Sequence, residues 1–364
     1  MLKVLHSPVN IGNQPWALSR AERALGAGSD VVVNYGTWVG FPNDRCLSEY
    51  GTNTWQDTLK RAAFALSAPL RYDVLHYYFG RTLMCWDDRG VRDAKWYSDL
   101  KLARALKRRT FMTLQGCDVR LAGASNAMNA VTMCREGGCG AYAACVSTYD
   151  AQRQWLIDNV LPELDGVFYL NPELGHFLKG RGKFLPYITV DWRDFEPMPP
   201  RDTGVIRIVH APSDTGIKGT PAILAAIEEL KKHYPIEFIQ VSGKTHDEAM
   251  EIYKSADLAI DQVIAGWYGA YAVEMMAMGK PVMCYIRDED LHYIPPRMVE
   301  EMAILRVHPE RLVQDIGAIL DQRSCWQEWS VRSRRYVAEW HDPQKIAATM
   351  LETYRTPGFQ FNMA

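Results

Sequence analysis

The stretch "GWYGAYAVEMMAMGKPVMCYI", residues 266–286, has the pattern of a loop, a helix and a strand in immediate succession. Two glycines mark the loop, Gly279 ends the apolar run as a helix C-terminal cap prefers, and "KPVMCYI" is typical of a buried strand. Glu274 is the only charged residue of the loop and helix. Such an acid is either favoured near a helix N-terminus by the macrodipole, or it accepts hydrogen bonds from a ligand such as a ribose diol.

The same alternation of strand and helix continues on both sides of this stretch. "DLAIDQVI" and "VIRIVHAPS" predict strands, and "GTPAILAAIEELKKHY" has apolar positions at helical spacing. In the first half, "SDVVVNYG", "YDVLHYYF", "RTFMTLQG" and "LDGVFYLN" are further apolar, strand-like runs. We therefore expect an α/β protein with two Rossmann-like, doubly wound domains that face a cleft, where such folds bind ligands.

Length and composition set the domain boundaries. The 364 residues are too many for one ordinary core, and prolines and charges between residues 185 and 204 indicate a linker. The expected organisation is a first domain with a cysteine-containing insert, a linker, a second domain, and a C-terminal helix and tail that pack back on the first domain. Their ranges are 1–190 with the insert near 117–150, 191–204, 205–340 and 341–364.

The net charge of −2 gives no reason to expect nucleic acid as a partner. No apolar run approaches the ~20 residues of a membrane span, and no signal peptide is recognisable at the start. A cytoplasmic location is expected.

The segment "VHAPSDTGIKGTPAILAAI" predicts an anion site after a strand. Lys218 and Gly219 stand directly before a helix, with Thr220 as a candidate N-cap. Helix N-termini attract anions and a lysine adds a full charge, so a phosphate is the natural guest. A surface lysine before a helix is the alternative, because the spacing is not that of a P-loop.

Taken together, the two stretches resemble a known family. The order "HAPS…KGT…AI" followed by "SADLAIDQ…GWYGAYAVEMMAMGKPV" is similar to the C-terminal half of GT-B glycosyltransferases, in particular the large retaining family that includes sucrose and mannosyl transferases. "YDVLHYYF" and "FMTLQGCDVR" are similar to segments of its N-terminal half. The resemblance implies an acceptor domain over 1–190 and a nucleotide-sugar donor domain over 205–340.

The resemblance also implies roles for single residues. Glu274 matches the acid that binds the ribose of the nucleotide-sugar, and Lys218, beside Gly219, matches the lysine on the diphosphate. The loop that faces the donor corresponds to Gly266, Trp267, Tyr268 and Gly269. The family retains anomeric configuration and needs neither metal nor cofactor, so the same is expected here, with the nucleotide-sugar as substrate.

The sequence departs from the family pattern at three places. Gly266 stands where the family has the acid that touches the donor sugar, and Gln115 stands where it often has histidine. The arginine of the phosphate loop is missing, with His210 and Ser213 in its neighbourhood. Imidazole and hydroxyl groups also bind phosphate or sugar, so both are donor-site candidates.

Three residues are candidates for catalysis. Lys218 would stabilise the charge of the nucleoside diphosphate leaving group as the glycosidic bond breaks. His76 and Asp118 are candidates for the cleft face of the first domain, and Gly12 is a donor-binding candidate in a loop where the acceptor or the donor pyrophosphate could pass. The alternatives are that His76 is a packed histidine in an aromatic strand and that Asp118 caps a turn.

Three cysteines within twelve residues, and a fourth nearby, raise the possibility of a structural zinc site. They are Cys134, Cys139, Cys145 and Cys117. Their spacing is not that of a zinc motif, so the expected metal content is none and small apolar fillers are the favoured interpretation.

The segment 101–110, "KLARALKRRT", carries five cations. It either forms a solvated helix face or touches an anionic membrane on its cytoplasmic side, where lipid-linked acceptors are found.

The sequence therefore favours a glycosyltransferase that moves a sugar from a nucleotide-sugar to a glycan, a lipid-linked acceptor or a small molecule, with retention of configuration. Two alternatives stay open. A non-catalytic nucleotide- or sugar-binding protein on the same scaffold is favoured by Gly266. A nucleotide-sugar isomerase would need an acid/base set that the sequence does not assign.

Overall fold

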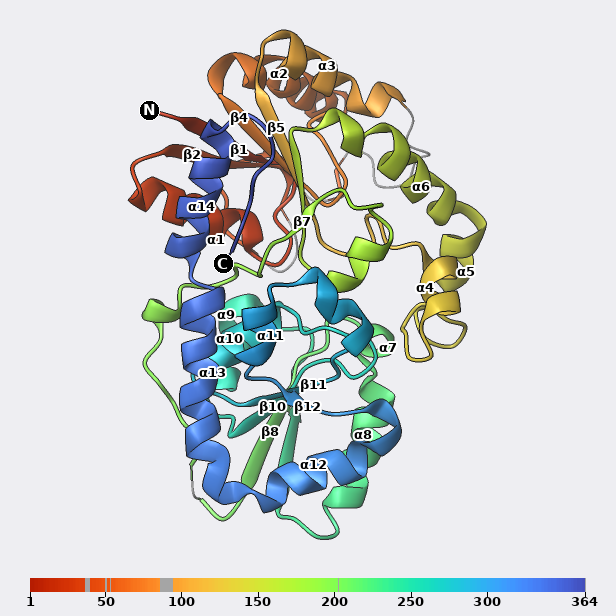
Figure 1. Cartoon of the computed structure of the whole chain (residues 1–364), viewed down its shortest axis with the longest axis vertical. Coiled ribbons are helices and arrows are strands. Elements are labelled where there is room, and N and C mark those ends of the chain that lie inside the picture. Colours follow the sequence, from red (N-terminus) through yellow and green to blue (C-terminus); the bar gives the residue numbers. More distant parts are fainter. Residues whose placement is uncertain (37–39, 50, 53, 86–93, 202, 364) are drawn as a thin grey trace. The chain divides into compact units, whose positions relative to one another are not determined.

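The computed structural model describes residues 1–364 except 37–39, 50, 53, 86–93, 202 and 364 (Figure 1). The chain forms two compact units. Unit 1 comprises residues 1–121, 147–188 and 343–364, and unit 2 comprises residues 122–146 and 189–342. Each unit is an α/β structure with a parallel sheet, as the alternating pattern predicts.

Unit 1 is built on a parallel sheet that has seven strands within the described residues, in the order β3-β2-β1-β4-β5-β6-β7. Its strands are β1 (Lys3–Ser7), β2 (Gly28–Tyr35), β3 (Arg45–Ser48), β4 (Val74–Tyr78), β5 (Arg109–Leu114), β6 (Gly166–Tyr169) and β7 (Lys183–Phe184). Its helices are α1 (Gln14–Ala24), α2 (Trp55–Arg71), α3 (Ser98–Ala105), α6 (Asp150–Asn159) and α14 (Pro343–Arg355). The order reverses between β1 and β4, which makes the carboxyl ends of these two strands the switch point of a doubly wound sheet.

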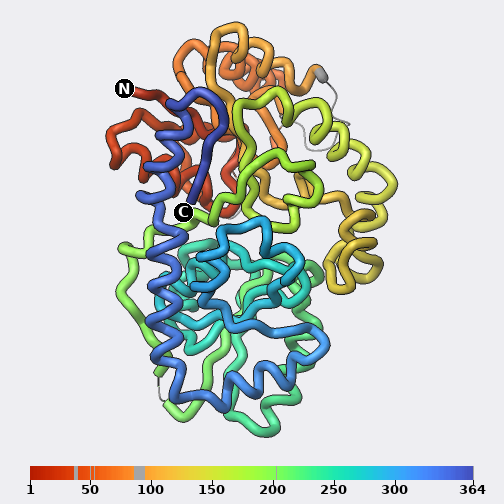
Figure 2. Tube along the Cα trace, in the orientation of Figure 1, coloured from red at the N-terminus to blue at the C-terminus, as the bar shows by residue number. Residues whose placement is uncertain are grey.

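The C-terminal helix α14 packs in unit 1. It lies beside α1 (Figure 2), and its Ile346, Met350 and Tyr354 join the core of α1 and the sheet. Strands buried on both faces explain why the first-half strands are continuous apolar runs rather than alternating ones.

Unit 2 contains the stretch quoted at the outset and has a parallel sheet of five strands within the described residues, in the order β12-β11-β10-β8-β9. The strands are β8 (Ile206–His210), β9 (Ile236–Gln240), β10 (Leu258–Ile260), β11 (Val282–Cys284) and β12 (Leu305–Arg306). The helices are α4 (Ala122–Met128), α5 (Tyr142–Ala144), α7 (Thr215–Lys218), α8 (Thr220–Leu230), α9 (His246–Lys254), α10 (Ala270–Ala277), α11 (Pro296–Glu300), α12 (Leu312–Asp321) and α13 (Trp326–Trp340). Here the order reverses between β8 and β10.

The segment 122–146 packs in unit 2, although the sequence places it in the range expected for the first domain. Met133, Cys134 and Cys145 belong to the same buried cluster as Ile208 of β8. Arg287 donates a hydrogen bond from Nη2 to the carbonyl oxygen of Val131 at 2.8 Å. The apolar side chains of the segment therefore find their partners on the second sheet.

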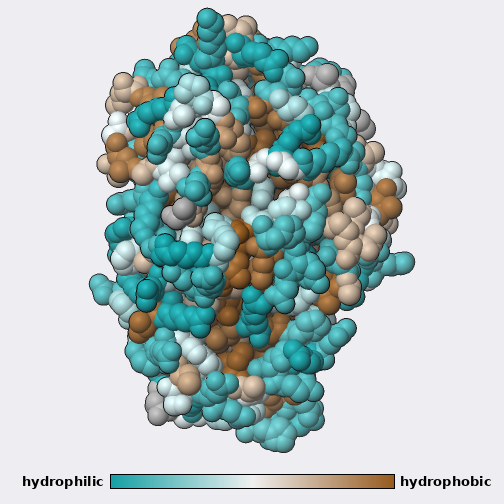
Figure 3. Space-filling model, in the orientation of Figure 1, coloured by the Kyte–Doolittle hydropathy of each residue, from teal (hydrophilic) through white to brown (hydrophobic). Residues whose placement is uncertain are grey.

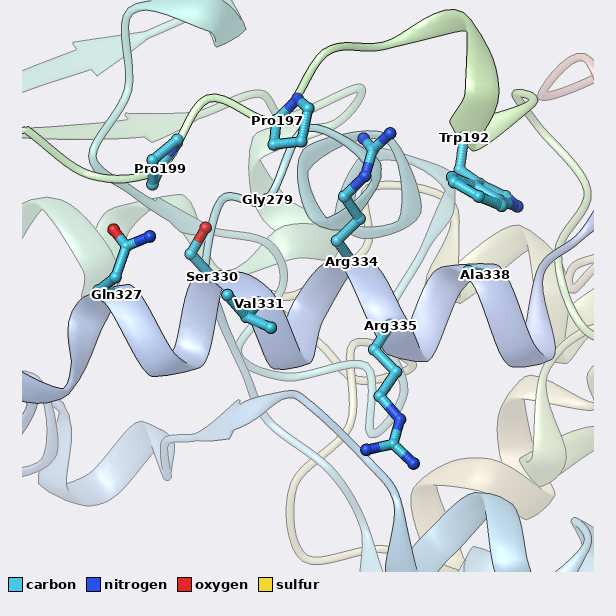
Figure 4. A pocket seen from close by; sticks show the side chains of 10 residues that line it. All are labelled: Trp192, Pro197, Pro199, Gly279, Gln327, Ser330, Val331, Arg334, Arg335 and Ala338. Atoms are coloured by element: carbon cyan, nitrogen blue, oxygen red, sulfur yellow. The ribbon is translucent and has the colours of Figure 1, made fainter.

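The expected linker also packs in unit 2, along helix α13. Trp192 donates from Nε1 to Asp342 at 3.1 Å, and Met198 N donates to Met278 O at 2.9 Å. Between this segment and α13 is an apolar hollow of about 390 Å³, lined by Trp192, Val331 and Arg334 among others (Figure 4). Gly279 lines it as well and precedes β11, so the hollow lies near the amino end of that strand.

Hydrophilic side chains form most of the face drawn in Figure 3, with smaller hydrophobic areas between them. Among the described residues, none of the helices combines the length and the apolar character needed to cross a bilayer.

Candidate functional site

Lys218 and Asp261 meet at the switch point of the second sheet. Lys218 ends the short helix α7 that follows β8, and Asp261 directly follows β10. Lys218 Nζ lies 2.5 Å from Asp261 Oδ1, and the other carboxylate oxygen of Asp261 accepts from Gly269 N at 2.7 Å. Both side chains are buried, and Lys218 Nζ lies 5.5 Å from the ring centroid of Tyr271. One buried acid thus orients the lysine and the N-cap of α10 together.

Gly219 allows the chain to turn directly after the lysine. Its φ is +75°, and a Cβ there would lie 2.6 Å from Cγ2 of Val263. Gly219, not Thr220 as the sequence suggests, is the N-cap of α8. The hydroxyl of Thr220 instead lies 2.8 Å from His210 Nε2.

The ring of His210 is enclosed by the protein, so neither ring nitrogen is free for the expected donor contact. The side chain is fully buried, and Nδ1 lies 2.8 Å from Ile260 O while Nε2 is held by Thr220. Burial lowers the pKa of His210 to about 4, so the ring is neutral near pH 7. His210 ties β8, β10 and α8 together beneath the lysine, whereas Ser213 is exposed on the loop before α7.

Glu274 is held by a histidine that the sequence interpretation did not single out. Its Oε1 lies 3.0 Å from Nε2 of His246, the first residue of α9. Glu274 is 5% exposed, whereas the side chain of His246 keeps 23% of its surface exposed. The hydrogen bond to Glu274 raises the pKa of His246, against the effect of burial. Helix α9 follows β9, so the position of His246 directly after a strand and its loop is the sequence signal that could have identified it.

The two charged pairs share one electrostatic neighbourhood. Burial is the main cause that raises the pKa of Tyr253, and the charges of Glu274 and Asp261 raise it further. The ring of Tyr271 lies 4.9 Å from that of Tyr253. Burial raises the pKa of Tyr271 as well, and the charges of Asp261 and Glu274 add to the effect. The edge of the second sheet thus carries a cation and an acid that are both mostly buried.

The loop that contains Gly266 is closed to a side chain. The φ of Gly266 is +82°, and a Cβ there would lie 2.8 Å from Cζ of Arg287. Arg287 is buried and pairs with Asp290 at 2.8 Å. A side chain at position 266 would therefore displace the guanidinium of Arg287.

The aromatic side chains of the loop pack inward, so neither ring is available to stack on a donor sugar. Trp267 and Tyr268 are 2% and 0% exposed. The hydroxyl of Tyr268 lies 2.9 Å from that of Tyr336 and 3.0 Å from Nε2 of His341. The amide of Gly269 is already bound to Asp261, so these three residues support the loop.

His76 is a core residue, which corrects its expected catalytic role. Its ring is fully buried, with Nδ1 at 2.6 Å from Tyr354 Oη and Nε2 at 2.7 Å from Thr113 Oγ1. Burial lowers its pKa well below the ordinary value of 6.5, so the ring is neutral. A group with no solvent contact and both nitrogens engaged cannot touch a substrate.

Asp118 caps a turn at the end of β5. Its carboxylate accepts from Gln115 N at 2.9 Å and from Gly116 N at 2.7 Å. Burial raises its pKa, and these two hydrogen bonds oppose the effect. Its oxygens are engaged in the turn, which favours the capping alternative over catalysis.

Amide side chains that the sequence interpretation gave no separate role gather near the carboxyl ends of unit 1 strands. Gln115 Nε2 donates to Ile11 O at 3.3 Å, and Asn171 Nδ2 donates to Gln115 O at 2.6 Å. Within the described residues, Asn10 Oδ1 and Gln115 Oε1 are buried without a hydrogen-bond partner. Gly12, with φ +65°, lies in the same loop as Asn10. Carbonyl oxygens of this kind accept hydrogen bonds from hydroxyl groups.

The four cysteines considered for zinc are not brought together. Cys134 and Cys145 are buried in the apolar core of unit 2, and Cys117 is exposed on unit 1. In the part of the chain that the structure describes, no three His, Cys, Asp or Glu side chains form a metal-binding group. The cysteines that are buried act as small apolar side chains.

Comparison with known proteins was made by sequence and by structure. No protein-family model matches the chain, and no curated protein matches it. Solved structures do: sucrose-phosphate synthase from Thermosynechococcus elongatus has 16% identity, covers 98% of each chain and gives a TM-score of 0.60. A glycosyltransferase from Rickettsia africae has 13% identity over 97% of this chain and 98% of that one, with a TM-score of 0.58.

A third structure, Anabaena HepE in complex with UDP and glucose, has 10% identity over 97% of this chain and 99% of that one, with a TM-score of 0.56. Likeness at these identities speaks for the fold and not for the reaction. The chain has the GT-B fold, which it shares with these glycosyltransferases.

Proposed function

We propose that this chain is a nucleotide-sugar-dependent glycosyltransferase whose donor binds at the carboxyl edge of the second sheet. The observation that carries the proposal is the pairing of Lys218 with Asp261 at the switch point, with Glu274 and His246 on the same edge. A buried cation suits a diphosphate, and an oriented carboxylate suits a ribose diol. Anabaena HepE, which has the same fold, is known in complex with UDP-glucose.

The proposed chemistry places charge stabilisation on Lys218. As the bond between the sugar and the diphosphate breaks, negative charge develops on the leaving phosphate, and a preorganised cation lowers the barrier most where water is excluded. Asp261 fixes the lysine and the α10 amide in advance, so little reorganisation is needed. The reacting sugar would pass through an oxocarbenium-like state, and retention of configuration is part of the proposal.

Glu274 and His246 have a positioning task in this proposal. His246 binds one carboxylate oxygen and so restricts the rotamer of Glu274, and the other oxygen is the proposed acceptor for the ribose diol. Unit 1 is the proposed acceptor unit, where the amides of Asn10 and Gln115 would bind acceptor hydroxyls.

A second candidate is a nucleotide- or sugar-binding protein without turnover. It is favoured by the closed environment of Gly266, where Arg287 occupies the space of the acid that the family uses on the donor sugar. The two candidates agree on nucleotide binding and differ in whether a donor is consumed.

The test is a thermal-shift and calorimetric screen of the full chain with UDP, GDP, ADP and their glucose conjugates. A ligand that binds the folded state raises the melting temperature by mass action. We expect one nucleotide to stabilise the wild type and to lose its effect in Glu274→Gln, while Glu251→Gln, an exposed acid on α9, behaves as wild type. If none of the nucleotides shifts the wild type, the donor-site proposal is wrong.

Turnover separates the two candidates. The preferred sugar conjugate is incubated with the wild type, and nucleotide release is followed with and without a panel of glycan acceptors. Release that depends on Lys218 supports the transferase. Tight binding of the intact conjugate with no release in any condition would favour the binding protein.

A further inference from the structure

Helix α2 of unit 1 has apolar side chains on two opposite faces. One face packs inward through Phe64, Ala65 and Ala68. The other carries four large apolar side chains that point to solvent. These are Trp55, Leu59, Leu66 and Leu70, which are 71%, 57%, 63% and 66% exposed. At 3.6 residues per turn the four lie within an arc of about 60°, so they form one stripe, the α2 stripe.

The folding of unit 1 does not account for the α2 stripe. Twelve large hydrophobic side chains are exposed among the described residues, and four of them lie on this single helix of 17 residues. The stripe runs for about 22 Å along the helix axis. Single exposed apolar residues are ordinary on a protein surface, but a contiguous row marks a surface that contacts something else.

Positive charge accompanies the stripe. The acids of α2 and of its neighbour α3 are Asp57 and Asp99, and both are buried in hydrogen bonds to their own unit. The exposed charged side chains of these two helices, which lie side by side in Figure 1, are all cations. They are Lys60, Arg71, Lys101 and Arg104, of which Lys60 lies 3.9 Å from Asp57 and Arg104 pairs with Glu163. A chain with a net charge of −2 thus presents cations and no exposed acid on the helix of the stripe and its neighbour α3.

We propose that the α2 stripe is a membrane-binding face, with its apolar side chains in the interfacial region of a bilayer and its cations against anionic lipid headgroups. Amphipathic helices bind membranes in this way, through buried apolar area together with attraction to anionic lipid. A tryptophan beside leucines suits the boundary between headgroups and acyl chains.

The bilayer is favoured over a protein partner by charge and shape. The exposed charged side chains of α2 and α3 have one sign, which complements an anionic surface, and the stripe lies on an exposed helix face rather than in a groove. The basic segment 101–110 contributes less than its sequence suggests, because Arg104, Arg108 and Arg109 pair with Glu163, Asp73 and Asp165. This surface belongs to unit 1 and does not depend on the proposed donor site.

The test is co-sedimentation of the full chain with vesicles of phosphatidylcholine, with and without phosphatidylglycerol. We expect binding to the anionic vesicles that weakens with salt, and at least about tenfold weaker binding to neutral vesicles. The double variant Leu59→Glu/Leu66→Glu should lose binding by about tenfold or more, because it removes apolar area and adds repulsion. Lys60→Ala should weaken it by about fivefold on anionic vesicles only.

The matched control is Val331→Glu on α13, where an equally exposed apolar residue of unit 2 receives the same charge. It should bind vesicles as the wild type does. All variants change exposed side chains, so their melting temperatures should match the wild type and any loss of binding is not a loss of fold.

Two results would overturn the proposal. One is a double variant that binds anionic vesicles as the wild type does, or a wild type that binds none. The other is a wild type that is dimeric in light scattering without lipid while the double variant is monomeric, since the stripe would then be an interface between two copies.

Discussion

Each unit contains a buried polar network built from similar residues, and the two networks differ in what they can do. In unit 1, His6 and His76 are paired across β1 and β4, with ring centroids 5.4 Å apart. Glu22 Oε2 lies 2.8 Å from His6 Nε2, and all three side chains are fully buried. In unit 2, Lys218 and Asp261 pair at the ends of strands rather than within them.

The difference teaches that position along the strand decides the role of a polar group. Both ring nitrogens of His6 and of His76, which lie within neighbouring strands of the first sheet, are bound by the protein, and the network joins α1 and α14 to the sheet. Groups beyond the strand ends of the second sheet keep part of their surface exposed, as His246 does. The first network is enclosed in the core, and the second is the one that we propose binds the donor.

The largest expected effect comes from removing the cation of the second network. Lys218→Met should lower the rate of sugar transfer by about 10²–10³, because a preorganised charge at the leaving group is lost. It should also destabilise unit 2 by about 3–5 kcal/mol, because Asp261 stays buried without its partner. Steady-state kinetics and thermal unfolding measure the two effects.

The double variant Lys218→Met/Asp261→Asn separates these effects. We expect it to regain much of the stability and none of the activity. Recovery of activity along with stability would show that Lys218 only supports the fold.

Removing the acid of the first network, Glu22, should lower the stability of unit 1 and leave the proposed nucleotide site intact. Glu22→Ala removes the acceptor of His6 and of Ser29, whose hydroxyl lies 2.7 Å from Glu22 Oε2. The loss of this buried acceptor should cost about 2–5 kcal/mol, because His6 Nε2 is left unsatisfied and Ser29 keeps only its contact with Ser19. Denaturant unfolding measures the cost, and nucleotide titration of the folded variant should give the wild-type affinity. A large loss of affinity would contradict the separation of the two networks.

A smaller loss of stability is expected from a substitution in the loop that contains Gly266. Gly266→Ala forces a side chain into a left-handed conformation and against Arg287, and should cost about 1–3 kcal/mol. Gly269→Ala is the matched control, since no heavy atom lies within 3.4 Å of its added Cβ and its φ is ordinary. Equal melting temperatures for the two variants would show that Arg287 does not restrict this position.

The smallest effect is a pH dependence of opposite sign in the two networks. The pKa of His76 is lowered by burial, so the unfolded state takes up the proton first and stability falls as pH drops below the ordinary value of 6.5. The pKa of His246 is raised by Glu274, so its contribution is complete below 6.5 and is lost as pH rises through the raised pKa.

The comparison of wild type with His246→Gln isolates the second contribution. The difference in melting temperature between the two proteins should be largest at acid pH and shrink above pH 6.5. Below pH 6.5 the contribution of His246 is complete, so further acidification should destabilise the wild type and His246→Gln by the same amount. A difference that does not change with pH would mean that His246 does not titrate in contact with Glu274.

Much of the fold could be predicted from the sequence, because the alternation of apolar runs and helical spacing reports parallel sheets directly. Lys218 and Glu274 could be named as candidates because each follows a strand that the pattern identifies and matches a residue that the family resemblance assigns to the donor. Their partners could not, because Asp261 and His246 lie 43 and 28 residues away along the chain. Only the order of strands in the sheet brings these residues together.

The errors have a common physical cause, which is burial by elements distant in sequence. Tyr268 stands in a glycine-rich loop, yet Tyr336 of α13 covers it. His76 is sealed by Tyr354 of the C-terminal helix. The segment 122–146 joins unit 2 because its apolar side chains fit that core, and no local pattern reports such a fit.

The most direct test of the donor-site account is a calorimetric titration with a matched pair of ligands, the preferred nucleoside diphosphate and its 2′,3′-dideoxy analogue. Wild type should bind the ribonucleotide at least about tenfold more tightly, because hydrogen bonds from the diol to a charged acceptor are lost in the analogue. In Glu274→Gln and in His246→Leu this preference should largely disappear while affinity for the analogue is kept. Equal affinity of the wild type for both ligands, or an undiminished preference in Glu274→Gln, would contradict the account.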